Sequence, residues 1–436
     1  MDFINREKEL FLLGETHERS LRSAQMTVIV GRRRIGKTSL AIKAFEKKLF
    51  LYFFISRKNE SLLCQDFLEE IGNKLKLPAL GEYTIFSRLF ELLLVTSQNQ
   101  PFTLIIDEFQ EFLHINPAIF GDMQNLWDRY KATARLNLVI SGSVYSLMKK
   151  IFENSKEPLF GRANERIYLK PFNVSVIKNL VAGINSHYKP EDLLAFYTIT
   201  GGVAKYVKHF ADKQRITLRK MLDEIFRENS LLADEGMNLL IEEFGRDYTT
   251  YFSILSLISS SKTSRSEIES ILGKNAGGYL EKLENDYSII RKVKPVLAKP
   301  GSKAQKYFIE DNFLGFWFRF IYKNKAALEI GNYSYARSIA ERDFESFSGP
   351  YLEKYFREKL ALSGDYSLIG RYWEKGNQNE IDIVAVNDNE KRILFAEVKR
   401  NKAKINPALL KAKSDKLLHA FPGYIVSFAH LSMEDM

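Results

Sequence analysis

The sequence predicts an α/β protein built from several domains, and three observations indicate this. Short β-branched runs alternate with helical patterns in the N-terminal part, as expected for a parallel sheet covered by helices. A mainly helical middle and a C-terminal part with two more strand-like runs follow. The chain has 436 residues, which is too long for one ordinary core and suggests roughly two to four domains.

Composition limits the class of protein. The excess of Lys and Arg (64) over Asp and Glu (54) gives a formal net charge of +10, which favours a polyanionic partner. The single cysteine, Cys64, excludes an intrachain disulfide and fits a reducing compartment. The charged N-terminal segment has no signal-like apolar core, and no apolar run reaches the roughly 20 residues that span a bilayer. We therefore expect a cytoplasmic protein with no membrane partner.

A glycine-rich segment, Gly31 to Thr38, follows a β-branched run that ends at Val30. It fits the pattern G-x-x-x-x-G-K-[ST], and a helical pattern comes after it. In such a loop the backbone N–H groups point at phosphate oxygens, and the helix N-terminus adds positive potential. Lys37 would reach the β- and γ-phosphates, and the Thr38 hydroxyl would ligate magnesium. We predict an ATP site that includes Gly31, Arg34, Gly36, Lys37, Thr38 and Ser39.

Two acids end the next strand-like run, Phe102 to Ile106. ATP hydrolysis requires one carboxylate on the magnesium side and a second that polarises the attacking water, so we assign these roles to Asp107 and Glu108. Taken alone, the pair would indicate a solvated acidic turn, and it is the upstream loop that favours catalysis. A third strand, Leu136 to Ser143, would place Ser143 near the γ-phosphate in a parallel sheet; a plain Ser-Gly turn is the alternative.

Two arginines, Arg162 and Arg166, come before a further short strand in "FGRANERIYLKPF". Either could act on a phosphate, in its own chain or in a neighbouring copy. An ordinary surface position is the favoured alternative for Arg166. We include Arg162 in the predicted nucleotide site.

The order of these segments resembles a known family. "FINREKEL", the loop at Gly31, "LIIDEFQEF", "SGS", "FGRANERIYLKPF" and "TGGVAKYV" occur as in the archaeal-type ATPases, on the AAA+/STAND side of the P-loop NTPases. The resemblance implies that Arg6 and Glu7 lie near the adenine and that Gly201-Gly202 belongs to a helical lid. Ala204 stands where that family would have proline. Related ATPases often form rings or dimers, so a homo-oligomer is expected.

The middle of the chain predicts a helical segment followed by a winged helix-turn-helix. Three helical patterns, including one with a capping box at Ser264 and Glu267 and an end at Gly273, come before a hairpin pattern around Lys299 to Ser302. Contact with DNA and contact with protein are both open: the third helix carries acids (Glu281, Glu284, Asp286), whereas the wing carries cations (Arg291, Lys292, Lys294, Lys299, Lys303, Lys306). The aromatic run Asn312 to Tyr322 predicts core packing rather than base stacking.

The last hundred residues place acids inside strand-like runs. Asp382 lies near the start of one run, and Glu397 and Lys399, two residues apart, share a face of the next. A hairpin through Asn387 to Asn389 would bring all three together, with Glu353 available from a preceding helix. Acids in an apolar strand are costly unless a cation compensates them, and hard oxygen ligands suit magnesium. This set fits phosphodiester hydrolysis, with the lysine stabilising charge or positioning water.

The order helix-Glu, strand-Asp, strand-Glu-x-Lys resembles the PD-(D/E)xK restriction-endonuclease-like fold. "GRYWEKGNQNEIDIVAV" and "FAEVKR" also resemble the C-terminal (DUF234-type) domain commonly fused to these ATPases. The resemblance implies Glu353, Asp382 and Glu397 as metal ligands, and Asp382, Glu397 and Lys399 as catalytic residues. An inert or degenerate version of the fold is the alternative. Between 399 and 416, seven basic residues stand against one acid, which indicates a patch for a nucleic-acid backbone or a solvated helix face.

Together these patterns predict a P-loop ATPase core (1–172), a helical lid (173–245), a winged helix (246–325) and a nuclease-like α/β domain (326–436). The expected function is ATP hydrolysis coupled to action on DNA, with ATP and Mg²⁺ as cofactors. The alternatives are an ATP-operated signalling or scaffold protein that cuts nothing, and a protein that binds DNA without cleavage.

Overall fold

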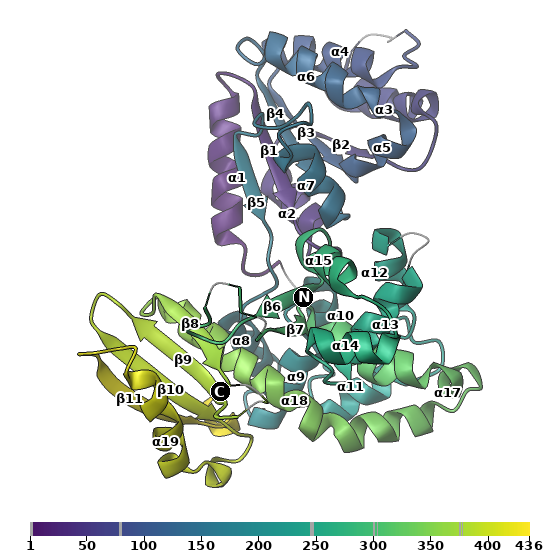
Figure 1. Cartoon of the computed structure of the whole chain (residues 1–436). Helices are drawn as coiled ribbons and strands as arrows, with labels where there is room; N and C mark the ends of the chain where they lie inside the picture. Colours follow the sequence, from purple (N-terminus) through teal and green to yellow (C-terminus); the bar gives the residue numbers. More distant parts are fainter. Residues whose placement is uncertain are drawn as a thin grey trace. The chain divides into compact units, whose positions relative to one another are not determined.

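The computed structural model describes residues 3–77, 81–244, 248–299, 301–302, 304–374, 376 and 378–436 (Figure 1). The chain divides into two compact units, one up to Lys170 and the other from Pro171 to Met436. The lid, winged-helix and nuclease-like segments predicted from the sequence all fall in the second unit, and their mutual boundaries stay predictions. Within the described residues, no helix is both long and apolar enough to cross a membrane.

The first unit is a three-layer α/β fold. Its five strands are parallel, in the order β2-β3-β4-β1-β5. The elements of this unit are α1 (Glu7–Ser20), β1 (Gln25–Val30), α2 (Lys37–Phe45), β2 (Phe50–Phe54), α3 (Glu60–Leu75), α4 (Phe86–Asn99), β3 (Phe102–Asp107), α5 (Phe112–Ile115), α6 (Ala118–Tyr130), β4 (Leu136–Ser141), α7 (Tyr145–Glu153) and β5 (Glu165–Tyr168). The predicted α/β class and parallel sheet are confirmed.

Alternation along the strands explains the layers. On β1, Met26, Val28 and Val30 pack into one apolar cluster with α3, α4, α6 and α7, whereas Ile29 packs into another with α1 and α2. Successive side chains of a strand point to opposite faces, so fully buried strands need helices on both sides. All six residues of β1, β3 and β4 are buried. The carboxyl ends of these three strands therefore meet along one edge of the sheet.

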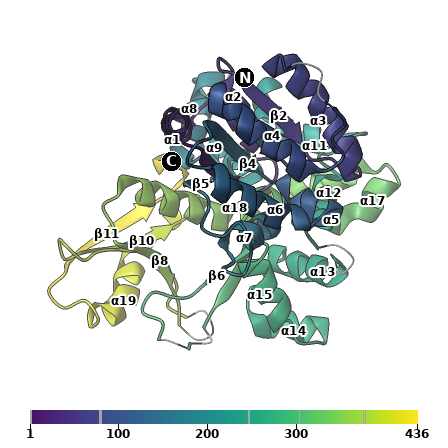
Figure 2. The same ribbon diagram turned by 90° about the horizontal axis from the view of Figure 1, so that it is seen from above.

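The second unit begins with a helical region and continues into three helices and a small sheet. Its elements up to Glu329 are α8 (Val174–Ile184), α9 (Pro190–Thr200), α10 (Ala204–Asp212), α11 (Leu218–Ile225), α12 (Glu235–Phe244), α13 (Tyr248–Ser259), α14 (Arg265–Leu272), α15 (Gly277–Asn285), β6 (Ile290–Val293), β7 (Lys306–Ile309), α16 (Asn312–Phe316) and α17 (Lys325–Glu329). Figure 2 shows α15 beside β6, and α13 contacts α14, α15 and β7.

Local signals in this region are confirmed where the structure describes them. The capping box of α14 joins Ser264 and Glu267, and Gly273 ends the helix with φ of +66°. β6 and β7 pair antiparallel. These are the elements expected for a winged helix, and the assignment of that module stays a prediction. Two residues of the expected wing turn, Pro300 and Lys303, lie outside the described residues.

The aromatic run after β7 is buried, as predicted for core packing. Phe313, Phe316, Phe318 and Phe320 are inaccessible to solvent. A π-helical turn, Trp317–Ile321, continues α16, and the Trp317 indole donates to the carbonyl of Ala233. The run therefore joins the helical region to the helices that follow it.

The C-terminal part is a four-stranded sheet in the order β11-β10-β9-β8. β8 (Leu368–Tyr372), β9 (Ile381–Asn387) and β10 (Arg392–Val398) are antiparallel, and β11 (Ile425–Leu431) is parallel to β10. The 31-residue helix α18 (Tyr333–Ser363) contacts β8 and β9, while α19 (Pro407–Leu418) contacts β9 and β10. The predicted hairpin between Asp382 and Glu397 is confirmed, because Asn387 pairs with Arg392 across the turn.

Candidate active sites

The loop between β1 and α2 has the backbone shape that its sequence predicts. Gly36 adopts φ of +96° and Arg34 φ of +73°, a region that favours glycine. Gly31 lies so close to Leu169 that an added Cβ would stand 2.8 Å from its carbonyl oxygen. Lys37 is buried and donates hydrogen bonds to the carbonyls of Gly31 (2.8 Å) and Arg32 (3.1 Å). Its ammonium group therefore lies over the loop.

The end of β3 connects this loop to the neighbouring strands. Asp107 is 3% exposed and accepts hydrogen bonds from Thr38 Oγ1 (2.6 Å), Ser141 Oγ (2.5 Å) and the Tyr52 hydroxyl (3.0 Å). Burial, followed by the charge of Asp107, raises the pKa of Tyr52, so this phenol remains a donor. Thr38 and Asp107 present two hard oxygen donors in contact, and such donors suit Mg²⁺.

Glu108 is held apart from Asp107 by its backbone and its partners. Its φ is +56°, and its carboxylate accepts from Ser143 Oγ (2.6 Å) and Gln110 Nε2 (2.6 Å). The predicted residues Thr38, Asp107, Glu108 and Ser143 therefore share one edge of the sheet. Ser143 donates its hydrogen bond to Glu108, and the local sequence of neither residue indicates this contact.

Four other predicted residues lie outside this hydrogen-bonded group. Ser39 is exposed on the first turn of α2. Arg162 donates to Asp128 (2.7 Å) and to the carbonyl of Pro158 (2.5 Å), and Arg166 donates to the carbonyl of Phe152. Arg6 is buried and donates to the carbonyl of Lys170 (2.8 Å), so it holds the start of α1 to the segment after β5.

Sequence reasoning missed Tyr52 and Gln110. Tyr52 lies on β2, whose run "FLYFF" is strongly β-forming and could have been identified as a strand of the same sheet. Gln110 follows Glu108 by two residues in a short turn, and only the structure shows that its side chain folds back onto the Glu108 carboxylate.

The C-terminal acids also come together, and basic side chains join them. Asp382 Oδ2 accepts from the backbone N–H of Val398 (2.8 Å) and lies 3.6 Å from Lys399 Nζ. Lys399 is 2.8 Å from Glu397, as expected for residues two apart on a strand. Burial lowers the pKa of Lys399, but Asp382 and Glu397 more than offset this and raise it above its ordinary value. Burial raises the pKa of Asp382.

Glu353 joins the cluster through two arginines that the sequence analysis did not single out. Its carboxylate lies 3.0 Å from Arg371 and 3.4 Å from Arg357. Burial raises the pKa of Glu353 to about 7. Among the described residues, no group of three or more acidic, histidine or cysteine side chains is arranged to hold a metal ion. The magnesium assignment of Glu353, Asp382 and Glu397 therefore stays a prediction, with a lysine and two arginines now among the acids.

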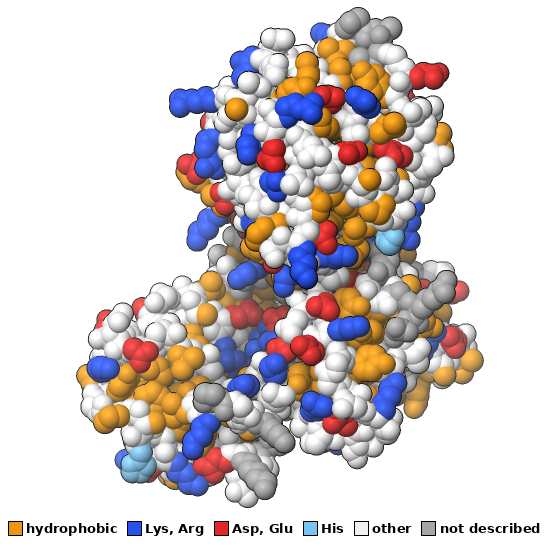
Figure 3. Space-filling model, turned by 45° about the horizontal axis from the view of Figure 1, so that its top comes forward, with side chains coloured by type: hydrophobic (Ala, Val, Ile, Leu, Met, Phe, Trp, Pro, Cys, Tyr) orange, Lys and Arg blue, Asp and Glu red, His pale blue; other side chains and the backbone are white. Residues whose placement is uncertain are grey.

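Several of the basic residues predicted to face a polyanion pair with acidic side chains instead. Lys413 turns back to Glu397 (3.6 Å), Lys416 lies near Glu374 (3.5 Å), and Lys292 of β6 pairs with Glu284 of α15 (2.9 Å). Lys404 and Lys411 are exposed. On the face shown in Figure 3, basic and acidic side chains are interspersed rather than gathered in one stripe.

A phosphate-binding loop, a parallel sheet and an Asp-Glu pair at its edge define the N-terminal unit as a P-loop ATPase domain. Residues 3–210 match the family described as "ATPase domain predominantly from Archaea". Residues 317–412 match a family described as "Archaea bacterial proteins of unknown function". The chain is thus similar to archaeal-type ATPase domains over residues 3–210 and to this second family over residues 317–412.

Two individual proteins are similar to this chain over most of its length. The uncharacterized protein MJECL04 of Methanocaldococcus jannaschii is 29% identical over 407 residues, which cover 91% of this chain and 87% of that protein. The solved structure of the Walker-type ATPase PABY2304 of Pyrococcus abyssi is 17% identical, with a TM-score of 0.56, and the likeness covers 73% of this chain and 96% of that one. The latter shows a shared fold.

Proposed function

We propose that this chain binds and hydrolyses ATP at the Gly31–Thr38 loop and that the nucleotide state controls a C-terminal domain acting on DNA. The observation that carries the first part is the contact between Thr38 and Asp107, with Glu108 beside it on separate partners. Thr38 and Asp107 would hold Mg²⁺, which neutralises phosphate charge. Glu108 accepts a proton from the attacking water while Ser143 and Gln110 keep its carboxylate in place.

Replacement of Lys37 tests the nucleotide site. In the full-length protein, Lys37→Ala removes the only loop ammonium expected to reach the β- and γ-phosphates. We expect ATP affinity, measured by calorimetry, to fall by roughly tenfold or more. A tenfold loss corresponds to about 1.4 kcal/mol of binding free energy. A Lys43→Ala variant is the matched control, because Lys43 pairs with Glu46 farther along α2. Equal affinity in the two variants would place the site elsewhere.

For the C-terminal domain, we propose metal-dependent cleavage of phosphodiester bonds by Asp382, Glu397 and Lys399. The convergence of these three side chains at the β9–β10 hairpin supports this proposal. Asp382 and Glu397 would hold Mg²⁺, which supplies Lewis-acid activation of the phosphate. Lys399 stabilises the charge that develops on the phosphoryl oxygens. The winged helix and the exposed lysines of residues 402–411 would contact the DNA backbone.

A second candidate is an ATP-operated scaffold that binds DNA or protein without cutting. It is favoured by a specific observation: every acid of the cluster already has a cationic partner, and Glu353 has two. Paired acids need no metal to compensate their burial. The residue types of the cluster favour cleavage, whereas the ion pairs among them favour a DUF234-type domain without catalytic activity.

Incubation of the full-length protein with labelled DNA and Mg²⁺, with and without ATP, separates the two candidates. Cleavage requires products that disappear in Asp382→Asn and Glu397→Gln while ATP hydrolysis persists. Glu390→Gln, in the exposed turn between β9 and β10, is the control and should cut like the parent. If the parent gives no products with any divalent metal, the scaffold candidate holds, and a steep loss of DNA affinity with salt would identify DNA as its ligand.

A further inference from the structure

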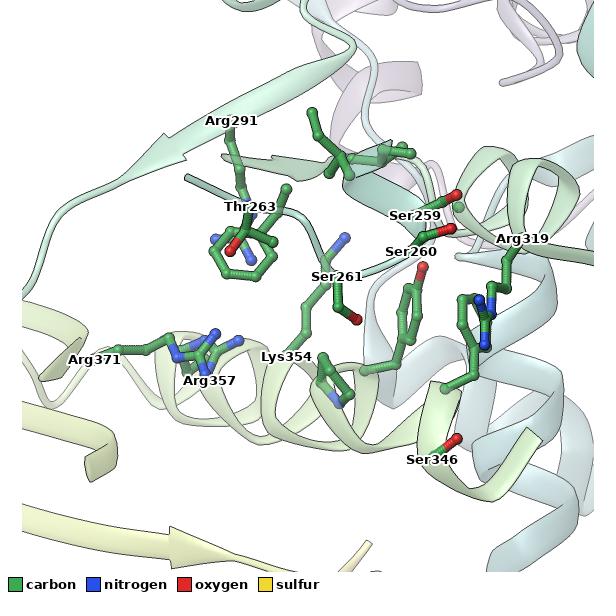
Figure 4. A pocket seen from close by; sticks show the side chains of 17 residues that line it. Ser259, Ser260, Ser261, Thr263, Arg291, Arg319, Ser346, Lys354, Arg357 and Arg371 are labelled. Atoms are coloured by element: carbon green, nitrogen blue, oxygen red, sulfur yellow. The ribbon is translucent and has the colours of Figure 1, made fainter. Parts of the chain in front are cut away.

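A cavity of about 210 Å³ lies within the second unit, apart from the predicted ATP site. Its walls come from the end of α13 and the turn after it, from β6 and β7, from β8 and from α18. Figure 4 shows Arg357 and Arg371 converging at one end of the cavity, with Arg291 reaching toward them from β6 and Lys354 rising from α18. Each wall is therefore a different element of the same unit.

The lining is strongly basic. Five of its seventeen described residues are Arg or Lys and none is Asp or Glu; the basic members are Arg291, Arg319, Lys354, Arg357 and Arg371. Ser259, Ser260, Ser261 and Thr263, at the end of α13 and in the turn after it, also line the cavity and bring hydroxyl groups to it. A cavity with positive charge and hydroxyl donors is suited to an anion with several oxygens.

The acids that balance these cations lie outside the lining. Glu310 pairs with Arg291 (3.1 Å), Asp343 is 3.6 Å from Arg319, and Glu353 and Glu380 share Arg371. Burial lowers the pKa of Arg357 to about 10; the charge of Glu353 opposes this effect, and the positive charges of Arg371 and Arg291 add to it. Buried cations that repel one another are costly unless an anion compensates them.

Two guanidinium groups retain hydrogen-bonding capacity. Arg371 is 8% exposed, and its Nε atom is buried with no hydrogen-bond partner. The Nε of Arg291 is likewise buried without a well-directed acceptor, although Glu310 is near. Both guanidinium groups lie over the ring of Phe308, at 5.6 Å for Arg291 and 5.4 Å for Arg371. A buried donor without an acceptor is rare in folded proteins, so both guanidinium groups beside the cavity are left with unmet hydrogen-bonding capacity.

We propose that this cavity binds the phosphate group of a nucleotide, either free or at the phosphorylated end of a nucleic-acid strand. Arginines in a fixed fork suit phosphate oxygens. Phe308, Phe347 and Tyr351 add aromatic surface for a sugar or base. Because Arg357 and Arg371 also contact Glu353, an occupied cavity competes with that carboxylate for both arginines. The inference does not depend on ATP hydrolysis or DNA cleavage.

The test uses the full-length protein carrying Lys37→Ala, without magnesium, to suppress binding at the ATP loop. Calorimetry compares inorganic phosphate, AMP, adenosine and a short single-stranded oligonucleotide with a 5′-phosphate or a 5′-hydroxyl end. We expect phosphate and AMP to bind and adenosine not to bind, and we expect the 5′-phosphorylated strand to bind more tightly than the 5′-hydroxyl strand. Tighter binding of AMP identifies a free nucleotide as the ligand, and tighter binding of the 5′-phosphorylated strand identifies a strand end. Both outcomes support the proposal.

Ser261→Asp supplies the matched perturbation. Ser261 lines the cavity, is exposed, and has φ of +67°, a conformation that Asp tolerates. The new carboxylate should lower affinity for the phosphorylated probe by at least about tenfold, since a like charge in a cavity repels the ligand. Ser270→Asp makes the same charge change on α14 outside the cavity and should shift affinity by less than about twofold. The proposal is overturned if no phosphorylated probe binds the folded protein, or if Ser261→Asp and Ser270→Asp behave alike.

Discussion

The hydrogen bonds to Asp107 allow its contribution to stability to be measured separately from its contribution to ATP hydrolysis. Asp107 accepts from the hydroxyls of Thr38, Ser141 and Tyr52 and from the backbone N–H of Glu108. We compare Asp107→Asn with Asp107→Ala. Asparagine keeps the shape and one carbonyl oxygen, and a hydroxyl can turn to accept a hydrogen bond from the new amide. Alanine leaves the same buried donors without an acceptor.

The expected magnitudes follow from that difference. Each buried donor left unsatisfied costs about 1–3 kcal/mol, so Asp107→Ala should lower the free energy of unfolding by roughly 3–5 kcal/mol. Asp107→Asn should lower it by only about 1–2 kcal/mol, because most partners can be re-satisfied. Both variants lose the negative charge that would face the metal. ATP turnover should therefore fall by about 10²-fold or more in each, at saturating ATP.

The assay is urea denaturation together with steady-state ATP hydrolysis. The chain has two units, so the unfolding transition of interest is the one that ATP shifts. If Asp107→Asn is destabilised as much as Asp107→Ala, the hydroxyl groups do not reorient and the hydrogen-bond reasoning is wrong. If Asp107→Asn hydrolyses ATP at the parent rate, the assignment of this carboxylate to the metal is refuted.

Two further predictions concern packing and pH. Gly142→Ala would place a Cβ 2.2 Å from Gln110 Oε1 and 2.4 Å from Met148 Sδ. This overpacking should lower the free energy of unfolding by about 1–3 kcal/mol. It should also slow ATP hydrolysis, because it displaces Gln110 from Glu108. Gly121→Ala in α6 is the control, because nothing lies within 4 Å of the added atom. It should be neutral or stabilising by roughly 0.5–1 kcal/mol. If Gly142→Ala and Gly121→Ala have equal effects in urea melts, the packing argument is wrong. Glu224 is buried and its pKa falls to about 2, since Lys213 and Arg227 outweigh the opposing effect of burial. Its stabilisation, at most about 3 kcal/mol, is therefore present above pH 4.5, the ordinary pKa of glutamate, and is lost as pH falls toward 2. Acid melts of Glu224→Gln should lack that part of the pH dependence, and a pH profile identical to the parent's would exclude the role.

The ATPase part of the fold could be predicted because its signals are local. Glycines at Gly31 and Gly36, a lysine and a threonine at fixed spacing, and a strand ending in acids each follow from a few neighbouring residues. Parallel strands then bring Asp107 and Ser143 to the edge that carries the loop.

The partners of these residues could not be predicted in the same way. Tyr52 is 55 residues from Asp107, and Arg371 lies on a strand separate from the helix that carries Glu353. Which cation pairs with which acid depends on how helix and sheet pack, and no local pattern encodes that. The alternation of the strands predicts that Glu397 and Lys399 share a face, whereas no local pattern predicts the arginines at Glu353. Those arginines bear on whether the cluster can bind a metal, because they compete with a metal for the same carboxylate oxygens.

Glu108→Gln tests the central claim most directly. Glutamine keeps the size of the side chain that Ser143 and Gln110 hold, but it cannot accept the proton of the attacking water. We predict that the variant binds ATP within about threefold of the parent affinity, while its turnover falls by about 10²- to 10⁴-fold. Turnover at the parent rate would contradict the account, because the ATPase site would then operate without the one carboxylate assigned to its chemistry.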